Sequence, residues 1–172
     1  MSNDEGEQIK EVYAQFGLAV YYAQVLEHAL VNALVYLDLI PSLARRARTR
    51  AEWEKEFDSF LNRHFETTLG KMIRNLSSVT AVPSNLEAML REALAKRNWL
   101  AHDYFRERAE QFMSMRGREK MLTELQEVQT LFDGADRSLD EVVRPLREKY
   151  GITDEKVAQV TRELLARARA DG

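Results

Sequence analysis

The chain has 172 residues, of which 45% are hydrophobic and 31% are charged. This balance suits one folded domain and is too apolar for a disordered chain. The absence of cysteine excludes disulfide bonds, thiolate metal sites and a cysteine nucleophile. Since the formal net charge is −3, binding to nucleic acid would depend on a local cluster of basic side chains rather than on a basic surface.

The N-terminal residues are acidic and lack the basic segment and following apolar stretch of a signal peptide. No uninterrupted run approaches the roughly 20 apolar residues of a membrane span, because side chains such as Glu27 and Asp38 break the richest stretch, residues 16–40. We therefore expect a soluble protein of the cytoplasm without a membrane segment.

The first half of the chain predicts several helices. Apolar residues that recur every three or four positions predict one long helix over residues 4–40, ended by Pro41 and Ser42. Shorter helices are predicted over residues 50–61 and 67–76. The basic stretch between Arg45 and Arg50 is read as a solvated connector, with contact to an RNA backbone as the alternative.

A further helix is predicted to begin at Ser84. Its hydroxyl can cap the helix, because Glu87 follows three residues later, as in a capping box. Apolar residues at helical spacing continue this helix to Arg97, and a polar stretch over residues 106–118 follows.

The longest apolar repeat predicts a helix over residues 119–150 that packs along its whole length against a partner. The repeat alternates steps of four and three through Met121, Leu125, Val128, Phe132, Ala135, Leu139, Val142 and Leu146. Gly151 ends this helix, and Thr153 caps a last one over residues 153–169. The repeat serves first for packing within the chain, and it is also long enough to form a dimer seam.

Strand-like alternation of useful length is missing from the sequence, which therefore predicts an all-α protein. The expected architecture is an up-and-down helical bundle with a long first helix and long C-terminal helices. We expect a single domain over residues 1–172, in which residues 1–110 form a bundle, 119–150 the long packing helix and 153–169 the C-terminal helix.

The segment RNWLAHDY, residues 97–104, carries the residues best suited to chemistry. The guanidinium of Arg97 can bind a phosphate and stabilise the charge of a transition state, and His102 can transfer a proton near neutral pH. Attack of a ribose 2′-hydroxyl on the adjacent phosphate needs only these functions, so RNA is the expected substrate. Asn98 could orient the histidine or a phosphate oxygen, and Tyr104 could bind phosphate or stack on a base.

The spacing of Arg97 and His102 sets a geometric condition. Five positions on an unbroken helix rotate a side chain by roughly 140°, so the two side chains would not share a face. They can cooperate only if the helix breaks between them or if a second subunit supplies matching groups. Otherwise Arg97 forms a surface ion pair and His102 caps a turn.

The same eight residues resemble the RX4HXY motif of HEPN domains, in the form found in HEPN toxins of toxin–antitoxin pairs. The resemblance implies a helical bundle that dimerises with its Arg–His motifs facing each other, and a metal-independent ribonuclease that leaves a 2′,3′-cyclic phosphate. By this resemblance Arg97 and His102 are catalytic and Asn98 is supportive. Tyr104 corresponds to the tyrosine that a partner nucleotidyltransferase modifies in some systems, and a cognate antitoxin is the other implied partner.

Other polar residues could support this segment or stand apart from it. On the first helix, Gln24 and Glu27 are interpreted as a satisfied polar cluster, and a second shell that holds the segment in place is the alternative. His64 is expected in a solvated turn. Because the histidines lack the spacing of metal ligands, we expect neither a metal site nor another cofactor.

The leading interpretation is a homodimeric ribonuclease or RNA-binding protein of prokaryotic defence or stress response. The alternative is a non-catalytic helical interaction module that binds a nucleotide or a protein partner, which the acidic balance and the extended last helices favour. A third interpretation is an antitoxin or immunity-type protein that sequesters its partner.

Overall fold

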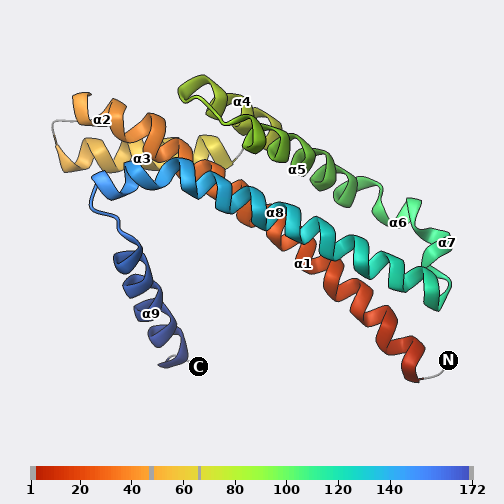
Figure 1. Ribbon diagram of the computed structural model, residues 1–172. Helices are drawn as coiled ribbons and strands as arrows, with labels where there is room; N and C mark the ends of the chain where they lie inside the picture. The colour runs from red at the N-terminus through yellow and green to blue at the C-terminus, as the bar shows by residue number, and fades with distance from the viewer. Residues whose placement is uncertain (1–2, 47–48, 66, 171–172) are drawn as a thin grey trace.

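The computed structural model describes residues 3–46, 49–65 and 67–170 (Figure 1). These residues form helices and short connectors and contain no strand, which confirms the predicted all-α class. Successive long helices reverse direction, as in an up-and-down bundle, and the last helix leaves the others (Figure 1).

The first helix does not end where the sequence predicts. Helix α1, Asn3–Leu34, continues through a π-helical turn, η1, Val35–Leu39, into α2, Ile40–Arg46. Pro41 therefore lies inside a helical path, and the predicted end at this residue is wrong. Proline lacks an N–H and its ring clashes with the carbonyl four residues earlier in an α-helix. The wider π-turn, in which Ile40 donates its N–H to the carbonyl of Val35, relieves this conflict.

The predicted short helices are present with shifted ends. They are α3, Arg50–Phe65, and α4, Leu69–Val79, and α5, Ser84–His102, follows. The capping box predicted for α5 is wrong. Pro83, rather than Ser84, occupies the N-cap position and has the extended conformation typical of it. Ser84 is therefore the first helical residue and makes no capping hydrogen bond. The carboxylate of Glu87 instead accepts a hydrogen bond from Arg91.

The polar stretch after α5 contains two single-turn helices, α6, Tyr104–Glu107, and α7, Ala109–Phe112. They lead into α8, Met115–Lys149, which starts a few residues before the predicted boundary. The last helix, α9, is Asp154–Ala170. It follows Gly151, whose φ of 76° favours glycine, and Thr153 caps it through Oγ1.

The core is built around α1 and α8, which run in the same direction along each other (Figure 1). Their parallel register follows from Gln8, which contacts the start of α8, and from Gln129, which donates to Gln15. Helix α5 crosses both in the opposite sense. The predicted stripe on α8 is buried as far as Leu139, after which Val143 replaces Val142 as the buried residue. The straight helix has by then rotated away from a strict seven-residue repeat.

Helix α9 makes little contact with the bundle and projects from it (Figure 1). None of its residues is buried, and its exposed apolar side chains are Val157, Val160, Leu164 and Leu165. The last helix thus leaves these apolar side chains unburied by the described part of the chain.

One helical stretch, Glu5–Arg46, is long and apolar enough to cross a membrane by these criteria alone. Its most apolar window is 44% buried inside the bundle, and core helices of soluble proteins meet the same criteria. The described residues thus hold one weak candidate for a membrane span.

The backbone of α8 lies very close to that of α7 at the turn between them. A Cβ placed on Gly117 would lie 2.0 Å from the backbone oxygen of Gln111. The neighbouring Arg118 is 3% exposed and donates to Gln8 on α1 and to the carbonyl of Phe112. The contact at Gly117 holds α7 against α8, and the hydrogen bonds of Arg118 connect both to the start of α1.

Gly117→Ala should therefore destabilise the protein by about 1–3 kcal/mol, because the backbone of α7 must move to admit the methyl group. Gly17→Ala is the matched control. A Cβ at Gly17 meets nothing within 4 Å, so this helical substitution should stabilise the protein by about 0.5–1 kcal/mol. Urea unfolding of both variants measures the difference, and equal stabilities would contradict the proposed backbone contact.

Candidate functional site: the end of helix α5

Arg97 lies on α5 and is joined to the first helix by an ion pair. Its Nε donates to Oε1 of Glu27 at 3.0 Å, and its Nη1 donates to Oδ1 of Asn98 at 3.4 Å. The contact from Glu27 to the segment, which the sequence analysis held only as the alternative, is thus present. Gln24 and Arg97 line the same small cleft of about 140 Å³ between α1 and α5.

The ion pair positions the guanidinium without using all of its donors. The Arg97 side chain is 38% exposed, and its Nη2 makes no hydrogen bond to any described residue. Arginine has five N–H donors, so a bound phosphate oxygen could still be reached. The arrangement can hold an anion at the surface between α1 and α5.

His102 is the last residue of α5 and is exposed to solvent. No hydrogen bond or ion pair connects its ring to another residue in the described ranges. Helix α5 is unbroken from Ser84 to His102, and the irregular geometry comes one residue later, at Asp103. The helix break required between Arg97 and His102 is therefore absent, and within one chain the two side chains point to different faces. Only the arrangement with a second subunit remains as a prediction.

Tyr104 is part of the core rather than of an open site. Its side chain is 1% exposed and packs against the rings of Phe16 and Trp99, with centroid distances of 5.5 and 4.8 Å. Its hydroxyl donates to the carbonyl of Met121 at 3.4 Å. Burial foremost, and then the charge of Glu124, raises the pKa of this phenol well above its usual range. In this conformation the hydroxyl cannot reach a phosphate, a base or a modifying enzyme, and the residue packs even more deeply than the half-buried packing that its type and context favour.

The other cations beside the segment are largely paired. Arg108 donates two hydrogen bonds to the carboxylate of Glu124, at 2.8 and 2.7 Å, and this pairing raises the pKa of the guanidinium. Arg106 pairs with Asp103. Lys96 lies over the ring of Trp99, 4.8 Å from its centroid, and has no ion pair with a described residue. The free positive charge near His102 is therefore small in a single chain.

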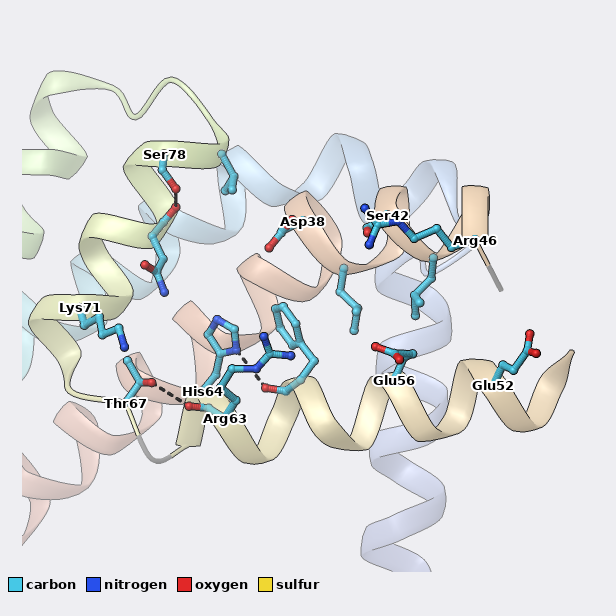
Figure 2. Close-up of a pocket in the computed structure, with 15 residues that line it drawn as sticks. Asp38, Ser42, Arg46, Glu52, Glu56, Arg63, His64, Thr67, Lys71 and Ser78 are labelled. Atoms are coloured by element: carbon cyan, nitrogen blue, oxygen red, sulfur yellow. Dashed lines mark hydrogen bonds between the residues drawn. The ribbon is translucent and has the colours of Figure 1, made fainter. Parts of the chain in front are cut away.

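The structure also reveals a larger cleft that the sequence interpretation missed. It has a volume of about 640 Å³ and lies between α2, α3 and α4, with Asp38, Glu56, Arg63, His64 and Lys71 among its lining residues (Figure 2). The expectation of His64 in a solvated turn is wrong, since the residue lies on α3 and is 8% exposed.

A sequence signal for this cleft exists on α3. Glu52, Glu56, Phe60 and His64 follow each other at steps of four, so they share one face of a helix. All four line the cleft. The pattern is mostly polar, which is why a search for apolar stripes passes over it.

No family model, curated protein or solved structure matches this chain. The resemblance to HEPN domains therefore rests on residues 97–104 and on the helical fold. Among the described residues, no group of three or more His, Asp or Glu side chains is placed to hold a metal ion.

Tyr104→Phe should cost about 1 kcal/mol or less, because it removes only one long hydrogen bond from a packed ring. Tyr104→Ala should cost about 3–5 kcal/mol, because it empties the ring's place in the core. Tyr21, which is 59% exposed, provides the control, and Tyr21→Phe should leave stability unchanged. Urea unfolding measures all three variants. A loss as large for Tyr104→Phe as for Tyr104→Ala would show that the hydroxyl, rather than the ring, carries the stability.

Proposed function

We propose that the protein is a cytoplasmic, homodimeric ribonuclease or RNA-binding protein of the HEPN type that works without a metal ion. The proposal is supported by two residues near the end of α5. His102 is exposed, and the guanidinium of Arg97 keeps N–H donors that no described residue uses. Because the two residues face apart in one chain, a functional site combines Arg97 of one protomer with His102 of the other.

An exposed apolar surface beside Arg97 supports dimer formation. Val20 and Gln24 of α1 line the Arg97 cleft, and Tyr21 between them is largely exposed, as is Leu18 on the same helix. Large exposed aromatic and aliphatic side chains are enriched in protein interfaces. A second chain that covers this surface would also exclude water from the site.

The chemistry requires two proton transfers and one anion-binding group. His102 accepts the proton of the ribose 2′-hydroxyl, whose oxygen then forms a bond to the adjacent phosphorus. The bond from phosphorus to the 5′-oxygen breaks, and that oxygen leaves with a proton from an acid in the site or from water. Arg97 binds the non-bridging oxygens and stabilises their charge in the transition state. The products are a 2′,3′-cyclic phosphate and a 5′-hydroxyl.

The proposal includes a role in prokaryotic defence or stress response, with a cognate antitoxin or nucleotidyltransferase as partner. Tyr104, the residue that such a transferase would modify, is buried, so its modification would require the segment after α5 to open.

RNA cleavage in EDTA tests the enzymatic proposal. Arg97→Ala and His102→Ala should each lower cleavage by about 100-fold or more, the size of a lost acid–base or charge-stabilising group. Arg91→Ala, an exposed arginine on the same helix, should retain wild-type cleavage. The enzymatic proposal would be overturned if Arg97→Ala and His102→Ala both kept wild-type cleavage, or if the wild-type protein cleaved none of a varied set of RNAs.

Mixing the two inactive variants tests the composite site directly. A heterodimer of Arg97→Ala and His102→Ala chains holds one site with both residues intact. A mixture that exchanges subunits should therefore regain about a quarter of wild-type cleavage. No recovery despite exchange would show that each site draws both residues from one chain.

A non-catalytic interaction module is the second candidate function. The observation that favours it is α9, whose apolar side chains are left exposed by the described residues. If this face holds two copies together, Leu164→Glu should convert a dimer to a monomer in light scattering, whereas Ala166→Glu on the opposite face of the same helix serves as a control for added charge. A dimer that survives Leu164→Glu would exclude α9 as the interface.

A further inference from the structure

The cleft between α2, α3 and α4 has the dimensions of a small-molecule site. Its volume of about 640 Å³ lies within the usual range for such sites. It is remote from the end of α5, because α2 and α3 occupy the opposite end of the bundle from α6 and α7 (Figure 1). The site proposed for RNA cleavage therefore does not account for it.

Two uncompensated cations stand at one end of this cleft. Arg63 from the last turn of α3 and Lys71 from α4 both line it, with Thr67 between them (Figure 2). Neither cation forms an ion pair with a residue in the described part of the chain. Elsewhere in the bundle, arginines such as Arg108 and Arg147 are paired with carboxylates. The two cleft cations are thus available for an anionic ligand.

His64 lies beside these cations in a fixed orientation. Its Nδ1 is 2.9 Å from the carbonyl oxygen of Phe60, and its ring stacks on the Phe60 ring with centroids 4.0 Å apart. Since a carbonyl oxygen only accepts hydrogen bonds, Nδ1 carries the proton and Nε2 remains for a ligand. Figure 2 shows the ring projecting from α3 into the space between α2 and α4.

The other end of the cleft carries more negative than positive charge. Glu56 precedes Arg63 by seven residues on α3, a separation of about 10 Å along the helix axis. Glu52 of α3 and Arg46 of α2 line this end as well, whereas Asp38 of η1 lines the cleft on the side of His64 (Figure 2). Glu56 forms no ion pair with a described residue, so its carboxylate is available for a cationic group of a ligand.

We propose that this cleft binds a phosphomonoester that carries a positively charged group about 10 Å from its phosphate. The phosphate lies at Arg63, His64 and Lys71, and the cationic group of the ligand lies at Glu56. A phosphate suits the basic end better than a carboxylate does, because Arg63 and Lys71 can donate from two helices to different oxygens of a tetrahedral group, while a protonated phosphate oxygen can donate to Nε2 of His64.

Calorimetric titration of the full chain with defined probes tests this proposal. The probes are 6-aminohexyl phosphate, hexyl phosphate and hexanoate. We expect saturable binding in which 6-aminohexyl phosphate is the tightest probe and hexanoate the weakest. Arg63→Ala and Lys71→Ala should each weaken phosphate binding about tenfold, the effect of one lost charge-assisted hydrogen bond. Arg74→Ala, which removes a cation of α4 outside the cleft, should change it less than twofold.

A substitution at Glu56 tests whether the ligand's cationic group binds at the other end of the cleft. Glu56→Gln should abolish the preference for 6-aminohexyl phosphate over hexyl phosphate without weakening hexyl phosphate. Binding to His64 can be followed by NMR of the imidazole nitrogens, with His64→Gln used to assign the resonance. Addition of 6-aminohexyl phosphate should shift Nε2 of His64 and leave His102 unchanged.

Several outcomes would overturn the proposal. They are equal binding of hexanoate and hexyl phosphate, an equal loss in Arg74→Ala, an unshifted His64 resonance, and an amine preference that survives Glu56→Gln. Should a variant fail to fold, the His64 shift in the wild-type protein still decides whether the cleft is occupied. These readouts do not depend on RNA cleavage, so the cleft and the proposed ribonuclease site can fail separately.

Discussion

The packing of α1 along α8 is the contact on which the other elements depend. Both helices bury a stripe of apolar side chains along most of their length, and Leu26, Leu30, Phe132 and Leu139 lie fully inside it. Burial of such side chains contributes roughly 1.5–3 kcal/mol each, which far exceeds the contribution of any surface ion pair in the molecule. Helix α5 can present Arg97 and His102 in defined directions because it rests on this pair.

The same packing decides what the segment after α5 can do. Tyr104 and Phe105 bind the start of α6 to the core through ring contacts with Phe16 of α1. The chain therefore turns only after His102, and α5 remains a straight helix up to that residue. An aromatic anchor that stabilises the bundle thereby keeps Arg97 and His102 on different faces, which is why the function proposed for this segment requires a second chain.

Charge is distributed differently in the two candidate sites. Around the end of α5 most cations are already paired, as Arg97 is with Glu27 and Arg108 with Glu124. In the cleft of α2, α3 and α4, the length of α3 keeps Glu56 apart from Arg63, and Arg63 and Lys71 have no ion pair with a described residue. A protein whose net charge is −3 can thus still offer a local site for an anion.

The sequence by itself determined the helical class, the long helices and the apolar stripe of α8, because helical periodicity is a local property that spacing along the chain records. It named Glu27 only as an alternative support of the Arg97 segment, and the structure decided that contact. Only the tertiary structure decided the passage through Pro41, the burial of Tyr104 and the cleft around His64. Each of these depends on contacts between residues far apart in sequence or on a backbone shift that compensates a local conflict, such as the π-turn before Pro41. Residues 97–104 illustrate this division. The sequence identified which residue types could bind phosphate or transfer a proton, but the direction of each side chain depends on the helices against which the segment packs.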